Sequence, residues 1–545
     1  MSNSKPFYDP VRKEVHGPKP SGLLTDTRGL GCFVLDAMKK WAKENKIAQI
    51  IAETGYEDPY KSLLSRCVRT AIAMRELGIQ KNDIITICSN HHLNSVVPLI
   101  AASFLGAITA PTDPSLSLDE TKHLLNLVKP KLVFASPNCV ELIANSLDKT
   151  DFKCELIVFG NDKNSKYKTF DWFLQERSDE NSFEPVVVED LLSTCLILFS
   201  SGTTGLPKGI CLTHKLVMKS ISGMTSLKTP VKTFLGYASL YWVSAVIIGI
   251  SSLGIGARRL LCQSFKPELV CDIIAKYQVD YLFIATVQAI QSIPFLNDNG
   301  NRVKYMMVSG SKIAPCYLEK LREKLPDAFI AGLYGQTEVG YITQLTEKDH
   351  NYSKLESCGL PMAGLTIKIV DLDTEENLPL GKVGEIRVKT DCGLNGYYRQ
   401  DSSGVWDSEG YIMTGDLGYF DNDLCLFVTD RIKEMFKYMS WHIVPAELEA
   451  TLQTHPDVDL AIVIGIPHPA DDNHALGIVT LQPNANVTAK QIEQYVNDRV
   501  NDRHKLRAGV MILDAKELPI TPTGKINRRL VKKIAESKLA INNNV

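Results

Sequence analysis

The sequence has no excess of charge of one sign. Its 60 Lys and Arg residues nearly balance 62 Asp and Glu residues, which leaves a net charge of -2. Nucleic acids and acidic membranes are bound by dense Lys/Arg fields, so we expect no nucleic-acid partner. The basic run "NRRLVKK" at 527–533 is typical of a solvated helix face. A small neutral or anionic ligand fits this charge balance better.

Paired cysteine spacings and long apolar runs are also missing. The 13 cysteines show no CxxC pair, which argues against a disulfide framework and against a zinc site and favours a reduced intracellular compartment. The polar N-terminal segment has no apolar core for a secretory signal. The apolar run at 243–256 is shorter than the ~20 residues that span a bilayer, so we predict a buried element and no membrane span.

The tripeptide "SKL" at 537–539 is followed by "AINNNV", and a peroxisomal address is read at a free C terminus, so we expect a cytoplasmic protein.

Length and pattern predict an α/β protein with two domains. A chain of 545 residues exceeds the ~250–300 residues that one core supports. Strand-like runs such as "DIITICSN", "CLILFSSG" and "AFIAGLYG" alternate with helical patterns from about 60 to 420, which indicates layered α/β sheets with many parallel strands. Short strands after residue 359 indicate a small β-subdomain. We predict a large N-terminal domain at 1–430 and a small α+β C-terminal domain at 431–545.

The stretch "SSGTTGLPKG" at 200–209 predicts a polyphosphate site. Glycine backbone can approach an anion closely, hydroxyls donate to it, and a lysine neutralises it. The residues concerned are Gly202, Gly205 and Gly209, the hydroxyls of Ser200, Ser201, Thr203 and Thr204, and the cation of Lys208. The pattern GxxxxGK[ST] is not met, which disfavours a P-loop NTPase. An ordinary strand-to-helix turn is the alternative.

Four further motifs carry candidate ligand groups. In "GLYGQTEVG", Tyr334, Thr337 and Glu338 offer an aromatic plane, a hydroxyl and a carboxylate, which suit an adenine, a phosphate and Mg²⁺. In "YIMTGDLGYFDND", Asp416 can accept hydrogen bonds from ribose hydroxyls or serve as a turn residue. The motifs "TDRIKEMFK" and "PITPTGKINRR" add Asp430, Arg431, Lys433, Lys437 and Lys525. Each motif alone is weak evidence for a function, and the evidence comes from the order and combination of the motifs.

Together these motifs resemble the adenylate-forming superfamily of acyl- and aryl-CoA synthetases, peptide-synthetase adenylation domains and beetle luciferases. "SSGTTGLPKG", "YGQTE", "TGD", "DRIKE" and "PTGK" occur in the order of that superfamily between about residues 50 and 535. The stretch "DRIKEMFKYMSWHIVPAELEA" is most similar to insect luciferases and luciferase-like acyl-CoA synthetases.

The resemblance implies a two-step reaction and a role for each motif. A carboxylate attacks the α-phosphate of ATP, which gives an acyl-adenylate and pyrophosphate, and a second step consumes the adenylate. The implied roles are the following: the loop from Ser200 to Lys208 holds the β- and γ-phosphates, Glu338 binds Mg²⁺, Thr337 touches the α-phosphate, Tyr334 lies against the adenine, and Asp416 with Arg431 holds the ribose. Lys525 would bridge the acid and the α-phosphate. The C-terminal domain would be mobile, rotating at Lys433 and presenting Lys437 for the second step.

Three stretches depart from the superfamily pattern, all near the acid or the thiol. The Pro-aromatic-His pattern reads "ASLYWVSAV" here, with Trp242 or Tyr241 in place of the histidine. The acid pocket, bordered also by Gly335, has a floor altered by Ser311, Lys312 and Ile313, where Lys312 would pair with a second acidic or phenolate group or point outward. Ser440 replaces a glycine that borders the pantetheine tunnel.

The leading hypothesis is a monomeric carboxylic acid–CoA ligase that uses ATP, Mg²⁺ and CoA on a bulky, aromatic or medium-length acid. The alternative is a luciferase-type monooxygenase that adenylates a luciferin and oxidises it with O₂ to emit light. A binding protein that has lost catalysis is disfavoured by the joint presence of Lys208, Glu338, Asp416, Arg431 and Lys525.

Overall fold

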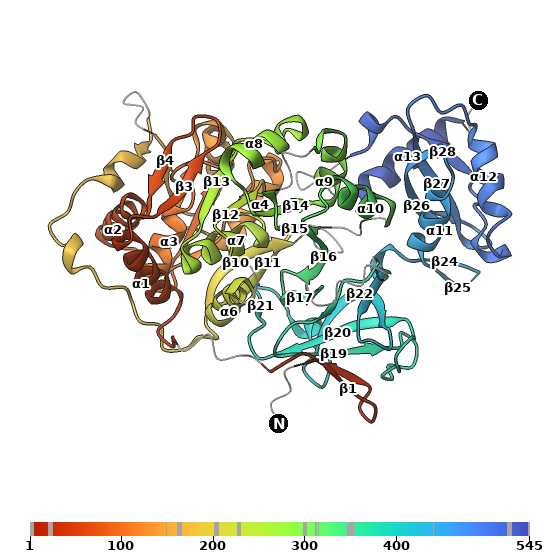
Figure 1. Cartoon of the computed structure of the whole chain (residues 1–545), viewed down its shortest axis with the longest axis horizontal. Helices are drawn as coiled ribbons and strands as arrows, with labels where there is room; N and C mark the ends of the chain where they lie inside the picture. The colour runs from red at the N-terminus through yellow and green to blue at the C-terminus, as the bar shows by residue number, and fades with distance from the viewer. Residues whose placement is uncertain are drawn as a thin grey trace. The chain divides into compact units, whose positions relative to one another are not determined.

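The computed structural model describes residues 5–19, 26–148, 150–160, 166–200, 207–225, 230–297, 302–310, 313, 315–345, 354, 356–439, 441–519 and 526–542 (Figure 1). The chain forms two compact units. The first consists of Met1–Tyr8, Val15–Ile367 and Val388–Met413, and the second of Asp9–Glu14, Lys368–Arg387 and Thr414–Val545. The predicted α/β class with a large and a small part is confirmed, and a boundary at Asp430 stays a prediction.

The first unit contains two large sheets. The order of the eight-stranded sheet is β21 (Leu394–Tyr397), β11 (Lys208–Thr213), β10 (Thr194–Ser200), β6 (Ile108–Thr109), β5 (Ile84–Cys88), β7 (Leu132–Ala135), β8 (Glu155–Val158) and β9 (Lys168–Thr169). The order of the nine-stranded sheet is β18 (Leu360–Pro361), β17 (Gly340–Gln344), β16 (Phe329–Gln336), β15 (Tyr305–Ser309), β14 (Tyr281–Ala285), β12 (Thr233–Gly236), β13 (Arg258–Leu261), β3 (Ile47–Ile51) and β4 (Glu57–Pro59). Central strands pair in parallel, as β5 with β7 and β14 with β15, because helices connect them.

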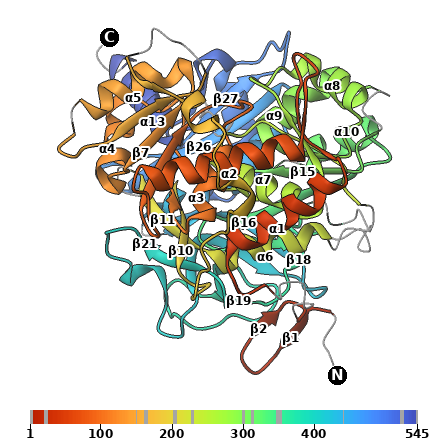
Figure 2. The same ribbon diagram turned by 90° about the vertical axis from the view of Figure 1, so that its left-hand side faces the viewer.

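Helices of the first unit pack against its two sheets and against one another. The helices of the first unit are α1 (Leu30–Lys43), α2 (Tyr60–Glu76), α3 (Val97–Phe104), α4 (Leu118–Val128), α5 (Val140–Leu147), α6 (His214–Thr225), α7 (Val243–Ile255), α8 (Val270–Tyr277), α9 (Thr286–Ser292) and α10 (Pro315–Lys324). Helix α3 contacts β5 and β6, whereas α2 contacts β3 and β4, and α7 contacts β12 and β13. Helix α1 contacts α2, α3 and α7, and Figure 2 shows α1 and α2 beside one another. Every residue of α3 is buried, which explains its apolar sequence.

The predicted buried element at 243–256 is confirmed, and a capping box sets the start of a second helix. Ser117 and Glu120 form a reciprocal capping box at the start of α4, which satisfies two backbone donors that a helix start leaves unpaired. The apolar run at 243–256 forms the buried helix α7, which ends at Gly256 with φ 71°. A side chain at Gly256 would collide with the ring of Trp41. Among the described residues, no helix is both long enough and apolar enough to cross a membrane.

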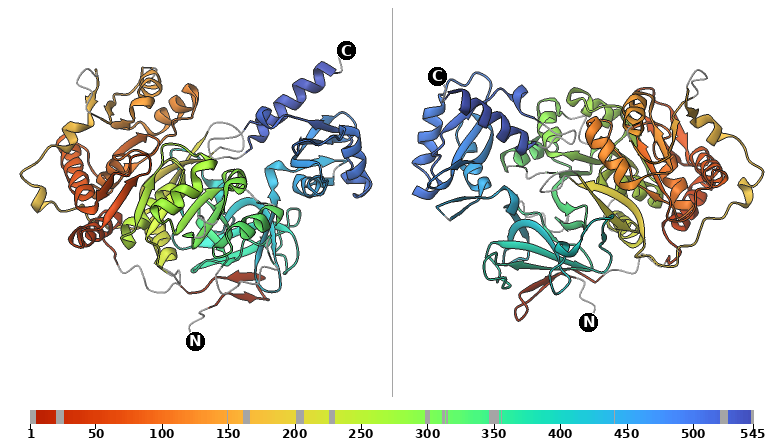
Figure 3. Two further views of the ribbon diagram at one scale, coloured as in Figure 1. Left: turned by 45° about the horizontal axis from the view of Figure 1, so that its top comes forward. Right: turned by 180° about the vertical axis from the view of Figure 1, so that it is seen from behind.

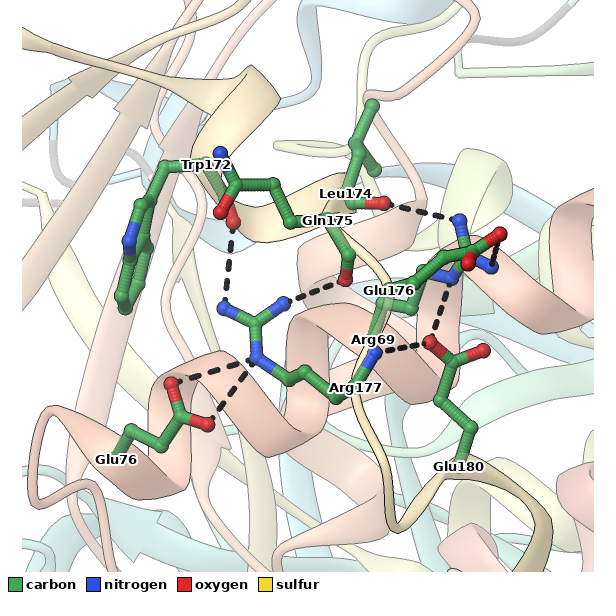
Figure 4. A network of polar contacts seen from close by, with 8 residues as sticks. All are labelled: Arg69, Glu76, Trp172, Leu174, Gln175, Glu176, Arg177 and Glu180. Carbon is green, nitrogen blue, oxygen red and sulfur yellow. Dashed lines mark hydrogen bonds and ion pairs between the residues drawn. The ribbon is translucent and has the colours of Figure 1, made fainter.

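An ion-pair network fixes the segment that leads into β10. The guanidinium of Arg177 donates to Glu76 on α2 at 3.2 Å and to the carbonyls of Gln175 and Trp172 at 2.8 and 3.2 Å (Figure 4). Arg69, also on α2, donates to Glu180 at 2.9 Å. The segment therefore enters the strand that precedes the glycine-rich loop from a fixed direction.

A third and a fourth sheet complete the fold. The six-stranded sheet has the order β1 (Phe7–Asp9), β2 (Glu14–His16), β19 (Leu365–Val370), β20 (Gly384–Thr390), β22 (Ile412–Phe420) and β23 (Leu426–Arg431). The five-stranded sheet consists of β25 (Trp441–Ile443), β24 (Phe436–Tyr438), β27 (Asp472–Leu481), β26 (Val458–His468) and β28 (Val510–Ile512). The remaining helices are α11 (Pro445–Gln453), α12 (Ala489–Asn497) and α13 (Arg528–Asn542), drawn in blue in Figure 3. Two apolar clusters, around Val463 and around Ile464, pack on opposite faces of β26.

Candidate active site

The glycine-rich loop joins two paired strands whose ends are firmly held. Ser200 and Lys208 are the last register pair of β10 and β11, while Ser201, Gly202, Thr203, Thr204 and Gly205 lie outside the described residues. The ring of His123 donates through Nε2 to the carbonyl of Pro207 at 3.0 Å. A side chain at Gly209 would approach Ile197 to 3.0 Å, and the Gly209 carbonyl accepts from the amide of Tyr398 at 2.7 Å. Bare backbone at Gly209 is therefore required for packing.

Strand β21 brings Lys208 and Glu338 to the same place. The Nζ atom of Lys208 lies 4.9 Å from the ring centroid of Tyr397, the last residue of β21. The first residue of β21, Leu394, donates its amide to the carbonyl of Glu338 at 3.2 Å. Burial raises the pKa of Tyr397, and the negative charge of Glu338 raises it further. Lys208 and Glu338, from distant parts of the sequence, therefore both lie near enough to Tyr397 for their charges to act on its ring or hydroxyl.

The turn between β16 and β17 presents the second predicted motif. Tyr334 is buried in β16, whereas Thr337 and Glu338 are half-exposed in the turn. A Cβ at Gly335 would lie 2.5 Å from the carbonyl oxygen of Gly340, and Gly340 has φ 80°. Side chains are thus excluded where the two strands approach most closely. One half-exposed carboxylate beside a hydroxyl fits Mg²⁺, which takes one or two protein carboxylates together with substrate phosphates.

Residues that flank the predicted acid-pocket residue Trp242 in the sequence line a cavity, and Trp242 itself is not part of that lining. The lining includes Gly236, Leu240, Ser244 and Phe283, around the carboxyl ends of β12 and β14, where open α/β sheets bind ligands. The Trp242 ring packs edge-on against Tyr241, with centroids 5.0 Å apart. Ser311 and Lys312 lie outside the described residues, and Ile313 is buried.

Two polar residues of the cavity lining were not predicted from the sequence. His91 accepts from the amide of Cys262 at 3.3 Å through Nδ1 and donates to the carbonyl of Ala238 at 2.9 Å through Nε2, and burial lowers its pKa. Arg259 on β13 donates to Gln49 at 2.6 Å. Burial lowers the pKa of Arg259 to about 10. The available signal was the pair of arginines in the apolar strand "GARRLLC".

In the second unit, Asp416 and Arg431 form an ion pair. They are register partners of β22 and β23, and Nε of Arg431 lies 3.0 Å from Oδ1 of Asp416. Asp416 is buried, whereas the Arg431 side chain is 48% exposed. The buried carboxylate is therefore held by a cation that remains accessible to a ligand.

The remaining predicted residues of the second unit lie on and after β23. Lys433 is in the 3₁₀ turn Ile432–Glu434, and the exposed Lys437 is on β24. Ser440 and Lys525 lie outside the described residues. The two ends of the Lys525 segment are joined, because the amide of Asn527 donates to the carbonyl of Pro519 at 2.8 Å.

An unpredicted residue, Arg528, anchors the chain just beyond Lys525. Its Nη2 donates to both carboxylate oxygens of Glu449 on α11, at 2.6 and 2.8 Å. Its Nη1 donates to the carbonyl of Val463 at 3.1 Å. This role could not be predicted from the sequence, because Arg528 belongs to the basic run "NRRLVKK", which is typical of a solvated helix face.

The comparisons with known proteins agree with these motifs. A family model described as AMP-binding enzyme matches residues 38–398, and one described as AMP-binding enzyme C-terminal domain matches 447–525. The chain is 27% identical to luciferin 4-monooxygenase of Photuris pensylvanica, over 96% of this chain and 98% of the relative. It is 27% identical to 4-coumarate–CoA ligase CCL1 of Humulus lupulus, over 85% and 86%. The solved luciferase-like enzyme from the nonluminescent mealworm Zophobas morio is 32% identical, with a TM-score of 0.73, over 77% of this chain and 99% of that chain.

Proposed function

Because this chain belongs to the AMP-binding enzyme family, we propose that it is a carboxylic acid–CoA ligase. A carboxylate oxygen of the acid attacks the α-phosphorus of ATP, the bond to the β-phosphate oxygen breaks, and pyrophosphate leaves with the electron pair. The thiolate of CoA then attacks the acyl carbon, a thioester forms, and AMP leaves. The substrate proposed is a bulky aromatic or medium-length acid, seated in the cavity lined by Gly236, Ser244 and Phe283.

The observation that carries this proposal is that Lys208 and Glu338 both lie near Tyr397. Phosphoryl transfer depends on positioning and on charge neutralisation, and a lysine and a carboxylate near the same residue support binding of an ATP–Mg²⁺ complex there. Glu338 would hold Mg²⁺, which neutralises phosphate charge when bound. Lys208 and Ser200 would hold the departing phosphates, Thr337 the α-phosphate, and Tyr334 the adenine.

The second unit supplies the remaining groups in this proposal. Asp416 accepts from the ribose hydroxyls, and Arg431 orients that carboxylate. Lys525 stabilises the charge that develops as acid and phosphate meet. After a rotation at Lys433, Lys437 would lie at the active site for the second step, thioester formation.

A luciferase-type monooxygenase is the second candidate. It is favoured by the similarity to luciferin 4-monooxygenase of Photuris pensylvanica. In that reaction the adenylate loses a proton beside its carbonyl and reacts with O₂. Similarity to an enzyme of a nonluminescent animal supports the ligase instead.

The test is a two-stage assay of the full chain with a panel of aromatic and medium-length acids. Acid-dependent exchange between pyrophosphate and ATP reports adenylation, and liquid chromatography after addition of CoA reports thioester. A ligase gives both signals. Light that requires O₂, without thioester for any acid that supports exchange, would refute the ligase and favour the monooxygenase.

A further inference from the structure

Three metal-ligating side chains meet at the turn between β26 and β27 in the second unit. His468 is the last residue of β26, Asp471 lies in the turn, and His474 is the third residue of β27. Nδ1 of His468 lies 3.3 Å from Oδ2 of Asp471, and Nε2 of His474 lies 2.8 Å from the same oxygen. Among the described residues, this is the group of His, Cys, Asp and Glu whose ligand atoms all lie within 4.8 Å of one another.

The hairpin register explains why the two histidines face each other. His468 pairs with Asp472, and His474 pairs with Ile466, so the two rings are diagonal neighbours on one face of the hairpin. The rings stack with centroids 3.9 Å apart and an angle of 14° between their planes. The left-handed φ of 65° at Asp472 reverses the chain and leaves Asp471 beside both rings.

The distances from the two histidine nitrogens to the Asp471 oxygen suit a tetrahedral ion, and binding requires the stacked rings to rotate apart, because each imidazole lone pair lies in the plane of its ring. Bonds of 2.0–2.2 Å from zinc to nitrogen and oxygen place neighbouring ligands about 3.3–3.5 Å apart. The contact between His468 and Asp471 already has this length, and the shorter contact of His474 has the length of a hydrogen bond that a metal would replace. Nδ1 of His468 is buried and makes no hydrogen bond, so its lone pair is available to a cation that Asp471 also binds.

We propose that His468, Asp471 and His474 bind a zinc ion, with water in the fourth position. Two imidazoles and one carboxylate suit zinc better than magnesium or calcium, which prefer oxygen ligands. All three ligands are half-buried, so the ion has access from solvent.

The turn that would hold zinc is bonded to the strand that carries Lys437. The side-chain amide of Asn473 donates to the carbonyl of Lys437 at 3.0 Å, and the amide of Met439 donates to the carbonyl of Asp471 at 3.0 Å. Zinc would thus fix the backbone on both sides of Tyr438. If the proposed function holds, zinc changes the rate of thioester formation more than the rate of adenylation.

The test is isothermal titration of the chelator-treated full chain with zinc chloride, without substrates. We expect one zinc per chain and, with Co²⁺, the visible absorption of a tetrahedral complex. His468→Ala and His474→Ala should each weaken zinc binding at least ~10-fold. The matched control is His442→Ala, which removes an exposed histidine of β25 and should leave the affinity unchanged.

Two outcomes overturn the site: no zinc binding by the wild type, or equal affinity in the wild type and both histidine variants. Circular dichroism checks that each variant folds, and Asp471→Asn, which keeps the size of the side chain, replaces any that does not. Because binding is measured without ATP, acid or CoA, failure of the proposed ligase activity leaves this test unaffected.

Discussion

The pair of Arg528 and Glu449 gives a prediction with a magnitude. In Arg528→Ala, Glu449 keeps the Val463 amide, at 2.7 Å, but loses both guanidinium contacts. Burial raises the pKa of Glu449, and the charge of Arg528 opposes that effect. Breaking a buried pair costs about 3–5 kcal/mol. Since the Arg528 side chain is 27% exposed, we expect the low end, about 3 kcal/mol.

Global unfolding of a chain with two units does not give a single free energy. Hydrogen exchange of the β26 amides measures the loss of stability within the second unit instead. Protection at Val463 and its neighbours should fall about 100-fold, which corresponds to about 3 kcal/mol. Lys533→Ala, on the same helix and exposed, should leave protection unchanged. The double variant Glu449→Leu/Arg528→Leu should recover most of the loss, because no charge stays buried. Unchanged protection in Arg528→Ala would refute the reasoning.

Three further predictions follow from local geometry and charge. Burial lowers the pKa of His214 from about 6.5 to about 4, so the folded chain favours the neutral ring. The contribution of His214 to the free energy of unfolding is fully present above pH 6.5 and falls by about 3 kcal/mol toward pH 4. In urea unfolding, His214→Gln should remove that part of the pH dependence. Gly335→Ala places a methyl group 2.5 Å from a backbone oxygen, which should lower the free energy of unfolding by about 1–3 kcal/mol and abolish pyrophosphate exchange. The control is Gly332→Ala on the same strand, where an added methyl group has nothing within 4 Å and should leave thermal unfolding unchanged. Asp416→Asn should raise the KM for ATP at least ~10-fold, the weakening expected for one charged hydrogen bond, with the KM for the acid unchanged; equal changes in both would contradict a ribose contact.

The elements of the large unit could be predicted because their periodicity is local. The apolar runs at 84–88, 194–200 and 329–336 all form strands, and the capping box at Ser117 marks a helix start within four residues. Contacts across the sequence could not be predicted in this way. Tyr397 meets Lys208 only because β21 adds to the edge of β11, a register that no local pattern encodes.

Side-chain partners that depend on tertiary packing were missed for the same reason. Arg528 resembled one of several surface cations until the fold placed it against Glu449, 79 positions away. The absence of cysteine pairs argued against a zinc site, but it carried no information on His468, Asp471 and His474. These residues are close in the sequence, yet their common face follows from the hairpin register.

The central claim is that this chain adenylates a carboxylic acid, and Lys525 tests it most directly. The measurement is acid-dependent pyrophosphate exchange by the wild type and by Lys525→Ala, with ATP affinity measured by titration on the same samples. The account predicts exchange by the wild type, a loss of at least ~100-fold in the variant, and ATP affinity within about threefold of the wild type. Exchange that survives in Lys525→Ala, or a wild type that exchanges with no acid of the panel while binding ATP, would contradict it.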